Sequence, residues 1–173
     1  MRTRSITVHE VLGRVIENPH TGELILIRKS AEQTNGRLLE FDLYLPPGGH
    51  VPGRHAHPEQ AERFTIIDGQ LRFRVGRRTM LVSAGETLEV PAGTAHWFGN
   101  ALPRVSHARV EVRPALRMED LLAEAAELDG SRKGLARLAA FLLEFERELA
   151  IPYVPARLVR AVLTALARFA ARA

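Results

Sequence analysis

Residues 63–75 constrain the fold more than any other stretch, because they contain two short apolar-rich runs separated by an Asp-Gly turn. The run RFTII precedes Asp68-Gly69, and the run LRFRV follows it. In the second run Leu71, Phe73 and Val75 alternate with two arginines. This period of two is typical of a β-strand with one buried face and one face in water. The stretch therefore predicts a pair of strands around the turn.

Similar turn signals recur through residues 1–113 and divide this region into short apolar-rich runs. They occur at Asn18-Pro19, Asn35-Gly36, Pro46-Pro47-Gly48-Gly49, Asp68-Gly69 and Ala92-Gly93. Many short strands at such a spacing favour a sandwich or a barrel. We therefore expect this region to be all-β.

The remainder of the chain has a helical pattern. We expect one helix from Met118, where early acidic residues suit a helix N-terminus. A second helix is expected over about residues 134–149 and a third from Ala156 to the end, with a proline-containing connector between them. The predicted organisation is a β-barrel over residues 1–115 followed by a helical appendage over residues 116–173.

The length and composition are those of a globular protein. A chain of 173 residues with 46% hydrophobic and 25% charged residues fits one domain with a real core, together with an appendage. The absence of cysteine excludes a disulfide scaffold, a zinc-thiolate site and a thiol nucleophile. The start MRTRSITVHE has no apolar signal-peptide segment, and no apolar run has the length of a membrane span. We expect a cytoplasmic protein.

The charge balance does not indicate a nucleic-acid partner. The isoelectric point is about 10.3, but the net charge is only +4. The positive residues are almost all arginine, since Lys29 and Lys133 are the only lysines, and they are spread along the chain. A phosphate-binding surface needs positive charge gathered on one face. We therefore attribute the basic character to compositional bias and expect no nucleic-acid partner.

The sequence HAH at residues 55–57 carries two histidines one residue apart. In a strand, residues i and i+2 point to the same face, so His55 and His57 project together. Two interpretations follow from this pattern. The pair belongs to a solvated strand surface, or both imidazoles bind one ion that Glu62 completes after a small turn.

The wider spacing distinguishes these interpretations. The segment GHVPGRHAHPEQAERFTIIDG covers residues 49–69, and GETLEVPAGTAHWFGN covers residues 85–100. Here the chain resembles the cupin superfamily, whose first and second motifs these segments match at every signature position. The resemblance covers residues 49–100 directly and implies a small jelly-roll barrel, also called a double-stranded β-helix, over about residues 8–113.

The resemblance also implies a metal site. It assigns His55, His57, Glu62 and His96 to one metal ion. Three neutral imidazoles and one carboxylate suit Fe, Mn, Ni, Cu or Zn, and they are too rich in nitrogen for Ca or Mg. Iron is the metal we expect first. Four protein ligands leave up to two positions of an octahedron open for water, substrate or dioxygen, although a purely structural ion would use the same ligands.

Two functional classes follow. The first is a metal-dependent oxidoreductase of the dioxygenase type that acts on a small, partly apolar organic substrate. The second is a non-redox metal cupin, either an isomerase or a small-molecule binding module. This step relies on analogy, because a fold alone does not determine function. Metal-free sugar-epimerase chemistry is disfavoured, because the set of four ligands is complete.

Other residues near the motifs are assigned by strand parity. Phe64, Ile66, Phe73 and Phe98 share parity with inward positions, so they are predicted to wall an apolar substrate pocket, although core packing explains them equally well. Trp97 has the opposite parity to His96, so we expect it outside the cavity. We expect His50 to be an exposed loop residue and His107 to lie on the surface.

The last predicted helix is amphipathic and basic. One arc of its helical wheel is apolar, and it comprises Leu158, Val159, Val162, Leu163, Leu166 and Phe169. The opposite arc carries arginines, and the segment has no acidic residue. Such a helix suits a membrane surface or a partner, or it packs on protein. We expect a helical hairpin over residues 134–173 that is docked on protein, without membrane binding, in a homodimer that binds a small-molecule substrate.

Overall fold

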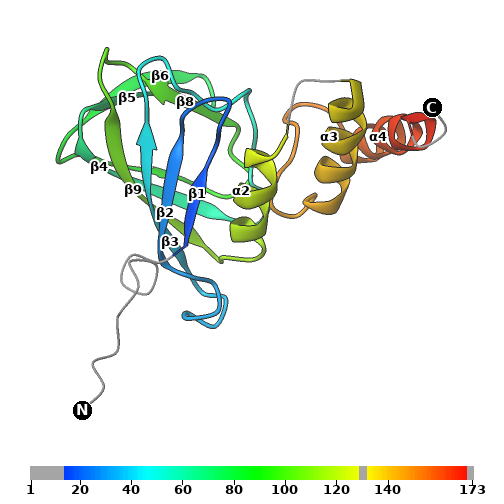
Figure 1. Ribbon diagram of the computed structural model, residues 1–173, viewed down its shortest axis with the longest axis horizontal. Coiled ribbons are helices and arrows are strands. Elements are labelled where there is room, and N and C mark those ends of the chain that lie inside the picture. Colours follow the sequence, from blue (N-terminus) through cyan, green and yellow to red (C-terminus); the bar gives the residue numbers. More distant parts are fainter. Residues whose placement is uncertain (1–13, 129–131, 171–173) are drawn as a thin grey trace.

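Two antiparallel sheets lie face to face and form a β-sandwich (Figure 1). The computed structural model describes residues 14–128 and 132–170. One sheet has the order β1-β2-β3-β9-β4-β7 and the other has the order β6-β5-β8. The strands are β1 (Val15–Glu17), β2 (Leu24–Lys29), β3 (Leu39–Leu45), β4 (Ala61–Asp68), β5 (Gln70–Val75), β6 (Arg78–Ser83), β7 (Thr87–Val90), β8 (His96–Asn100) and β9 (Ser106–Arg113). The all-β prediction is confirmed for residues 14–113, and residues 1–13 lie outside the described part of the chain.

The Asp-Gly turn joins two strands that do not pair with each other. Strand β4 pairs with β7 and β9, whereas β5 pairs with β6 and β8. Gly69 has a φ of +86°, and a Cβ atom there would lie 2.4 Å from the Oγ atom of Ser106. The turn is thus a corner packed tightly on the start of β9, where the chain passes from one sheet to the other. The expected strand pair around Asp68-Gly69 is wrong in its pairing, although both strands exist.

The alternation within β5 is confirmed by its burial. Leu71 and Phe73 are buried, and the arginines between and after them are exposed. The ring of Phe73 lies 5.0 Å from that of Phe64 and 5.6 Å from that of Phe98, between centroids. Phe64 and Phe98 are themselves 5.1 Å apart. These three rings join the two sheets at the centre of the core, where aromatic pairs add to the stabilisation from burial alone.

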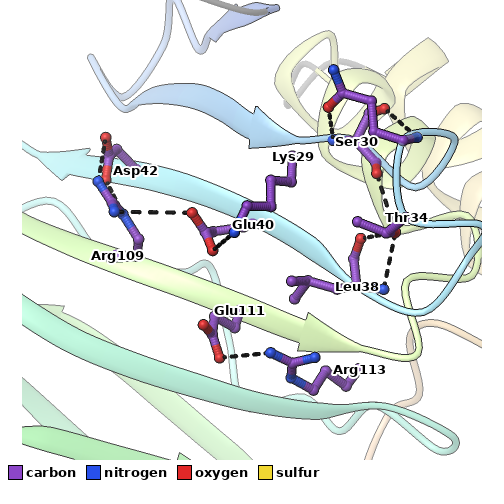
Figure 2. A network of polar contacts seen from close by, with 10 residues as sticks. Lys29, Ser30, Thr34, Leu38, Glu40, Asp42, Arg109, Glu111 and Arg113 are labelled. Atoms are coloured by element: carbon purple, nitrogen blue, oxygen red, sulfur yellow. Dashed lines mark hydrogen bonds and ion pairs between the residues drawn. The ribbon is translucent and has the colours of Figure 1, made fainter.

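The opposite face of the larger sheet carries a network of charges, and Figure 2 shows the part of it around Glu40, Asp42 and Arg109. Asp42 of β3 has no exposed surface. Its Oδ1 atom accepts a hydrogen bond from Nε of Arg109 at 2.9 Å, and its Oδ2 atom accepts one from Nε of Arg28 at 2.5 Å. Glu40, two residues earlier on the same face, accepts a hydrogen bond from Nζ of Lys29 at 3.1 Å. The long cationic side chains of β2 and β9 therefore cover the acidic residues of β3.

His107 belongs to the same network. Its Nε2 atom lies 3.2 Å from Oδ1 of Asp42, and its ring stacks on Tyr44 at 4.3 Å between centroids. The side chain is only 19% exposed. His107 therefore lies on the outer face of the sheet with Arg109, but Asp42 and Tyr44 of the neighbouring strand cover most of its side chain.

The C-terminal part contains the three helices α2 (Met118–Ala126), α3 (Arg132–Glu144) and α4 (Ala156–Ala170). Helix α3 ends earlier than the predicted boundary at residue 149. The chain then turns, and the backbone of Ala150 forms a two-way bridge with Ala56, with N···O distances of 2.8 and 3.0 Å. This bridge holds the end of the segment on the barrel. The division of the chain at residue 115 stays a prediction.

Helices α3 and α4 lie side by side, and α4 lies on the far side of α3 from the barrel (Figure 1). Leu163 of α4 is buried, but Leu158, Val162 and Leu166 are 54%, 51% and 47% exposed. The expected hairpin is present, but the expected burial of its apolar stripe is incomplete. In the part of the chain that the structure describes, no helix is both long and apolar enough to cross a membrane. The predicted homodimer stays a prediction.

Candidate metal centre

The backbone brings the histidines of the two sequence motifs together. His55 and His96 form a two-way bridge, with N···O distances of 3.0 and 2.8 Å. His57 follows His55 by two residues and therefore projects from the same side. Their ring centroids are 4.3 Å apart for His55 and His96, 5.0 Å for His55 and His57, and 5.2 Å for His57 and His96. One ring nitrogen from each lies within 4.8 Å of the others, as a shared metal ion requires.

Each of these imidazoles is oriented by a backbone carbonyl. The Nδ1 atoms of His55 and His96 lie 3.1 and 3.0 Å from the carbonyl oxygens of Gly53 and Thr94, and Nδ1 of His57 lies 2.5 Å from that of Glu148. A carbonyl oxygen only accepts, so each Nδ1 carries the proton and donates. The Nε2 atom of each neutral ring then presents its lone pair. Such outer hydrogen bonds are typical of metal-binding histidines.

Glu62 adds a carboxylate to this cluster from β4. Its Oε2 atom lies 2.8 Å from Nε2 of His96 and 3.3 Å from Nε2 of His57. All three atoms are buried, and none makes a hydrogen bond of acceptable geometry. Glu62 does not belong to the group of mutually close ligand atoms that the three histidines form. Converging, unpaired, buried donor atoms are costly without a cation between them, so the residues fit a bound metal ion.

The electrostatics also suit a cation. Burial, together with the neighbouring imidazoles of His96 and His57, lowers the pKa of His55 to about 4. Burial alone would raise the pKa of Glu62, but His57 and His96 outweigh it and hold that pKa well below its usual range. For His57, burial lowers the pKa, and the Glu62 carboxylate outweighs this effect and raises it. A divalent ion would replace the proton that Glu62 otherwise attracts to His57.

A cavity of about 460 Å³ opens onto His55, His57 and Glu62. Of the four predicted pocket residues, Phe64 and Phe98 line it. Ile66 and Phe73 do not line the cavity but are fully buried in the core. These two residues therefore belong to the packed core, which is the alternative that the sequence analysis left open for them.

The remaining sequence assignments near the site concern two residues of the barrel mouth. His50 is exposed, as expected, and its backbone bridges to Gly99. Trp97 donates a hydrogen bond from Nε1 to the carbonyl oxygen of Val51 at 2.9 Å and does not line the cavity. Both predictions are confirmed.

Sequence reasoning missed the contribution of the C-terminal segment. The carbonyl of Glu148 orients His57, and helices α2 and α3 supply much of the cavity wall. One signal in the sequence could have indicated this contribution, namely the apolar face of the predicted helix over residues 134–149. Such a face must pack against another surface. It did not indicate that this surface is the mouth of the barrel.

The comparisons with known proteins agree with this geometry. Residues 41–105 match the family model described as Cupin domain. A comparison with curated protein sequences gave no match.

Many solved structures share the fold, and three of them show the degree of likeness. An RmlC-like cupin from Shewanella frigidimarina is 16% identical with a TM-score of 0.54, covering 68% of this chain and 96% of its own. The Cnp3 cupin domain of Schizosaccharomyces pombe is 12% identical with a TM-score of 0.51, covering 62% and 72%. KdgF from a Halomonas species is 15% identical with a TM-score of 0.50, covering 58% and 86%. Likeness at this level establishes the jelly-roll fold, and the site must be interpreted from its own residues.

Proposed function

The chain belongs to the cupin superfamily, and from that premise we propose that it is a metal-dependent oxidoreductase of the dioxygenase type that acts on a small organic substrate. One divalent transition metal ion would be held by His55, His57, His96 and Glu62. The observation that carries the proposal is the convergence of unpaired, buried Nε2 atoms on a carboxylate oxygen, with every Nδ1 fixed by a carbonyl.

The donor set favours particular metals. Three imidazole nitrogens and one carboxylate suit Fe(II), Mn, Ni, Cu or Zn, whereas Ca and Mg prefer oxygen donors. Iron is the metal we propose first. When bound, the ion would supply Lewis-acid or redox chemistry at positions that the protein leaves open.

The residues of the chain have three tasks around that ion. Glu62 supplies the negative charge that holds a divalent cation, and its low pKa keeps it ionised at neutral pH. The carbonyls of Gly53, Thr94 and Glu148 fix the ring orientations and leave each Nε2 atom available to the ion. Phe64 and Phe98 face the cavity beside the site and exclude water. Water exclusion strengthens the electrostatic interactions between ligand and site.

A second candidate is a non-redox metal cupin, either an isomerase or a small-molecule binding module. It is supported by the mainly apolar wall of the cavity. Such a wall suits capture of a ligand by burial of its apolar surface. The two candidates share the metal site and differ in what the metal does there.

Anaerobic purification followed by metal analysis separates the candidates. The oxidoreductase proposal expects iron as the main metal, together with substrate-dependent oxygen uptake by iron-loaded protein against a panel of small apolar carboxylates. Zinc-loaded protein is the matched control and should consume no oxygen. Tightly bound zinc or nickel, with no oxygen uptake after iron loading, would overturn the oxidoreductase proposal and favour the second candidate.

A further inference from the structure

We infer that the cavity over the metal centre takes a ligand with one anionic oxygen-bearing head and an extended apolar body, and that the C-terminal helices select the apolar body. The inference rests on the proposed metal function, because the head is placed at the metal. It deepens that function by naming the class of ligand.

The cavity has one polar end and one long apolar wall. The polar end is formed by His55, His57 and Glu62. The apolar wall comes partly from barrel residues such as Ile25, Phe41 and Phe64. The rest comes from α2, α3 and the segment after α3, and it includes Leu121, Leu122, Phe141, Leu142, Leu149 and Ile151. Every residue of α2 and α3 that lines the cavity is apolar. A ligand that fills this space must therefore bury apolar surface along most of its length.

The helical part of the apolar wall lies outside the shared barrel. The family match ends at residue 105, and α2 begins at Met118. Leu121 and Phe141 are each 6% exposed and belong to the same buried cluster as the core residues of the barrel. Helix α3 is additionally held by the bridge between Ala150 and Ala56. The helices thus add an apolar wall at the mouth of the barrel.

The wall also excludes classes of ligand. A sugar or a nucleotide carries many hydroxyl or phosphate groups, and each would lose its water against a leucine or a phenylalanine without gaining a partner. Each unpaired polar group buried in this way costs roughly 1–3 kcal/mol in general. The remaining polar lining comes from Arg54, which precedes His55, and from the β1–β2 turn, which contributes Asn18, His20, Thr21 and Glu23. A ligand with a single polar head at the metal end leaves the fewest of its polar groups without a hydrogen-bond partner.

The volume fits a small organic molecule. At about 460 Å³, the cavity lies within the range of roughly 300–1,000 Å³ that small-molecule sites occupy. The open coordination positions of a divalent transition metal accept an oxygen anion such as a carboxylate. A linear alkyl carboxylate is therefore the simplest probe with the inferred chemistry.

The test is a chain-length series. Full-length protein loaded with Zn²⁺ is titrated calorimetrically with acetate, butyrate, hexanoate, octanoate and decanoate. Affinity should rise about three- to fourfold per added methylene until the cavity is filled. Equal affinity for acetate and decanoate, or tighter binding of polyhydroxylated gluconate than of hexanoate, would overturn the inference.

Two variants test the role of the helices. Leu142→Gln should flatten the chain-length dependence while leaving acetate affinity and zinc content unchanged. Ala125→Leu keeps the wall apolar but fills space, so it should retain short carboxylates and lose the longest ones. Arg137→Gln is the matched control, because Arg137 is an exposed residue of α3 that does not line this cavity. A Leu142→Gln variant with an unchanged chain-length slope would contradict selection by the helices.

Failure of the metal proposal is distinguishable from failure of this inference. Zinc content is measured independently of ligand binding. Linear alcohols of the same chain lengths, titrated into metal-free protein, report the apolar wall alone. A chain-length dependence with alcohols but no zinc binding would overturn the proposed metal function and support the inferred role of the apolar wall. Zinc binding without any chain-length dependence would overturn the inference and keep the metal function.

Discussion

Nδ1 of His57 donates a hydrogen bond to the backbone carbonyl oxygen of Glu148, which lies 91 residues further along the chain. The contact links the first histidine motif of the barrel to the segment that follows α3. One residue before His57 and two residues after Glu148, the backbones of Ala56 and Ala150 form their two-way bridge. The C-terminal segment is therefore built into the metal centre, where it orients a proposed ligand.

This link predicts that the C-terminal segment controls metal affinity. Ala150→Pro removes the amide that donates to the Ala56 carbonyl, and it should displace the Glu148 carbonyl from His57. Loss of an outer hydrogen bond of this kind lowers metal affinity by about 10- to 100-fold. Competition with a chromogenic zinc chelator measures the change. Ala150→Ser keeps the amide and is the control, and equal zinc affinity in the proline and serine variants would argue against the role of the segment.

A second prediction concerns the carboxylate. Glu62→Gln keeps the shape of the side chain and removes its charge, so zinc affinity should fall by more than about 100-fold, beyond the range of outer-shell losses. The pKa of His57 in the metal-free protein should also fall, because Glu62 is what raises it. NMR titration of the imidazole follows this shift. The control is Glu59→Gln, an exposed carboxylate that pairs with Arg147, and no change of the His57 pKa in Glu62→Gln would contradict the assignment.

A third prediction concerns pH and the charge network of Figure 2. Burial would raise the pKa of Asp42, but Arg109, Arg28 and His107 outweigh it and lower that pKa. The native state therefore binds this proton less readily than the unfolded state. The stabilisation is present above the unfolded pKa of about 3.9 and is lost as the pH falls through the lower native value.

Asp42→Asn should consequently lower the free energy of unfolding by about 2–3 kcal/mol at pH 7, the scale of hydrogen bonds to charged groups. The difference from the wild type should shrink as the pH falls below about 4. Urea denaturation between pH 3 and 7 measures both. Asp120→Asn, at an exposed ion pair, should change stability by less than about 0.5 kcal/mol. A difference that is constant across this pH range would refute the charge-based explanation.

A fourth prediction compares two glycines with similar backbone angles. Gly69 and Gly36 have φ values of +86° and +74°, but only Gly69 has a neighbour, Ser106, within contact of a new Cβ atom. Gly36→Ala should cost about 1–2 kcal/mol for the left-handed conformation alone. Gly69→Ala should cost clearly more, because the Ser106 backbone must also move. Denaturant unfolding of both variants decides this, and equal destabilisation would mean that the corner at Gly69 relaxes freely.

Some features of the fold could be predicted because their signals are local. The alternation in β5 requires only the period of a strand, and the spacing of His55 and His57 requires only that i and i+2 share a face. The pairing of β4 and β5 could not be predicted in the same way. An Asp-Gly turn forms both hairpins and corners, and the corner here is specified by Ser106, which is distant in sequence.

The same difference between local and long-range signals determines which parts of the site could be predicted. The histidines and Glu62 lie in two motifs whose spacing is recognisable, so all four could be proposed as ligands from sequence, and the structure brings the three histidines together. The environment of His107 depends on Asp42 and Tyr44 on a neighbouring strand. The helical wall of the cavity depends on where the amphipathic helices dock. An apolar face predicts that a helix packs against another surface, but it does not predict which surface. In α4 several residues of the apolar face are exposed, so the expectation that an apolar face is covered is only partly met for this helix.

The central claim is that the three histidines and Glu62 bind one transition metal ion, and metal content measured by mass spectrometry tests it most directly. Protein purified after growth with supplemented iron, manganese and zinc is compared with His57→Ala, His96→Ala and the control His50→Ala. We predict close to one metal ion per chain in the wild type and the control, and almost none in the two ligand variants. Circular dichroism should show the barrel folded in all of them. Unchanged metal stoichiometry in both folded ligand variants would contradict the account.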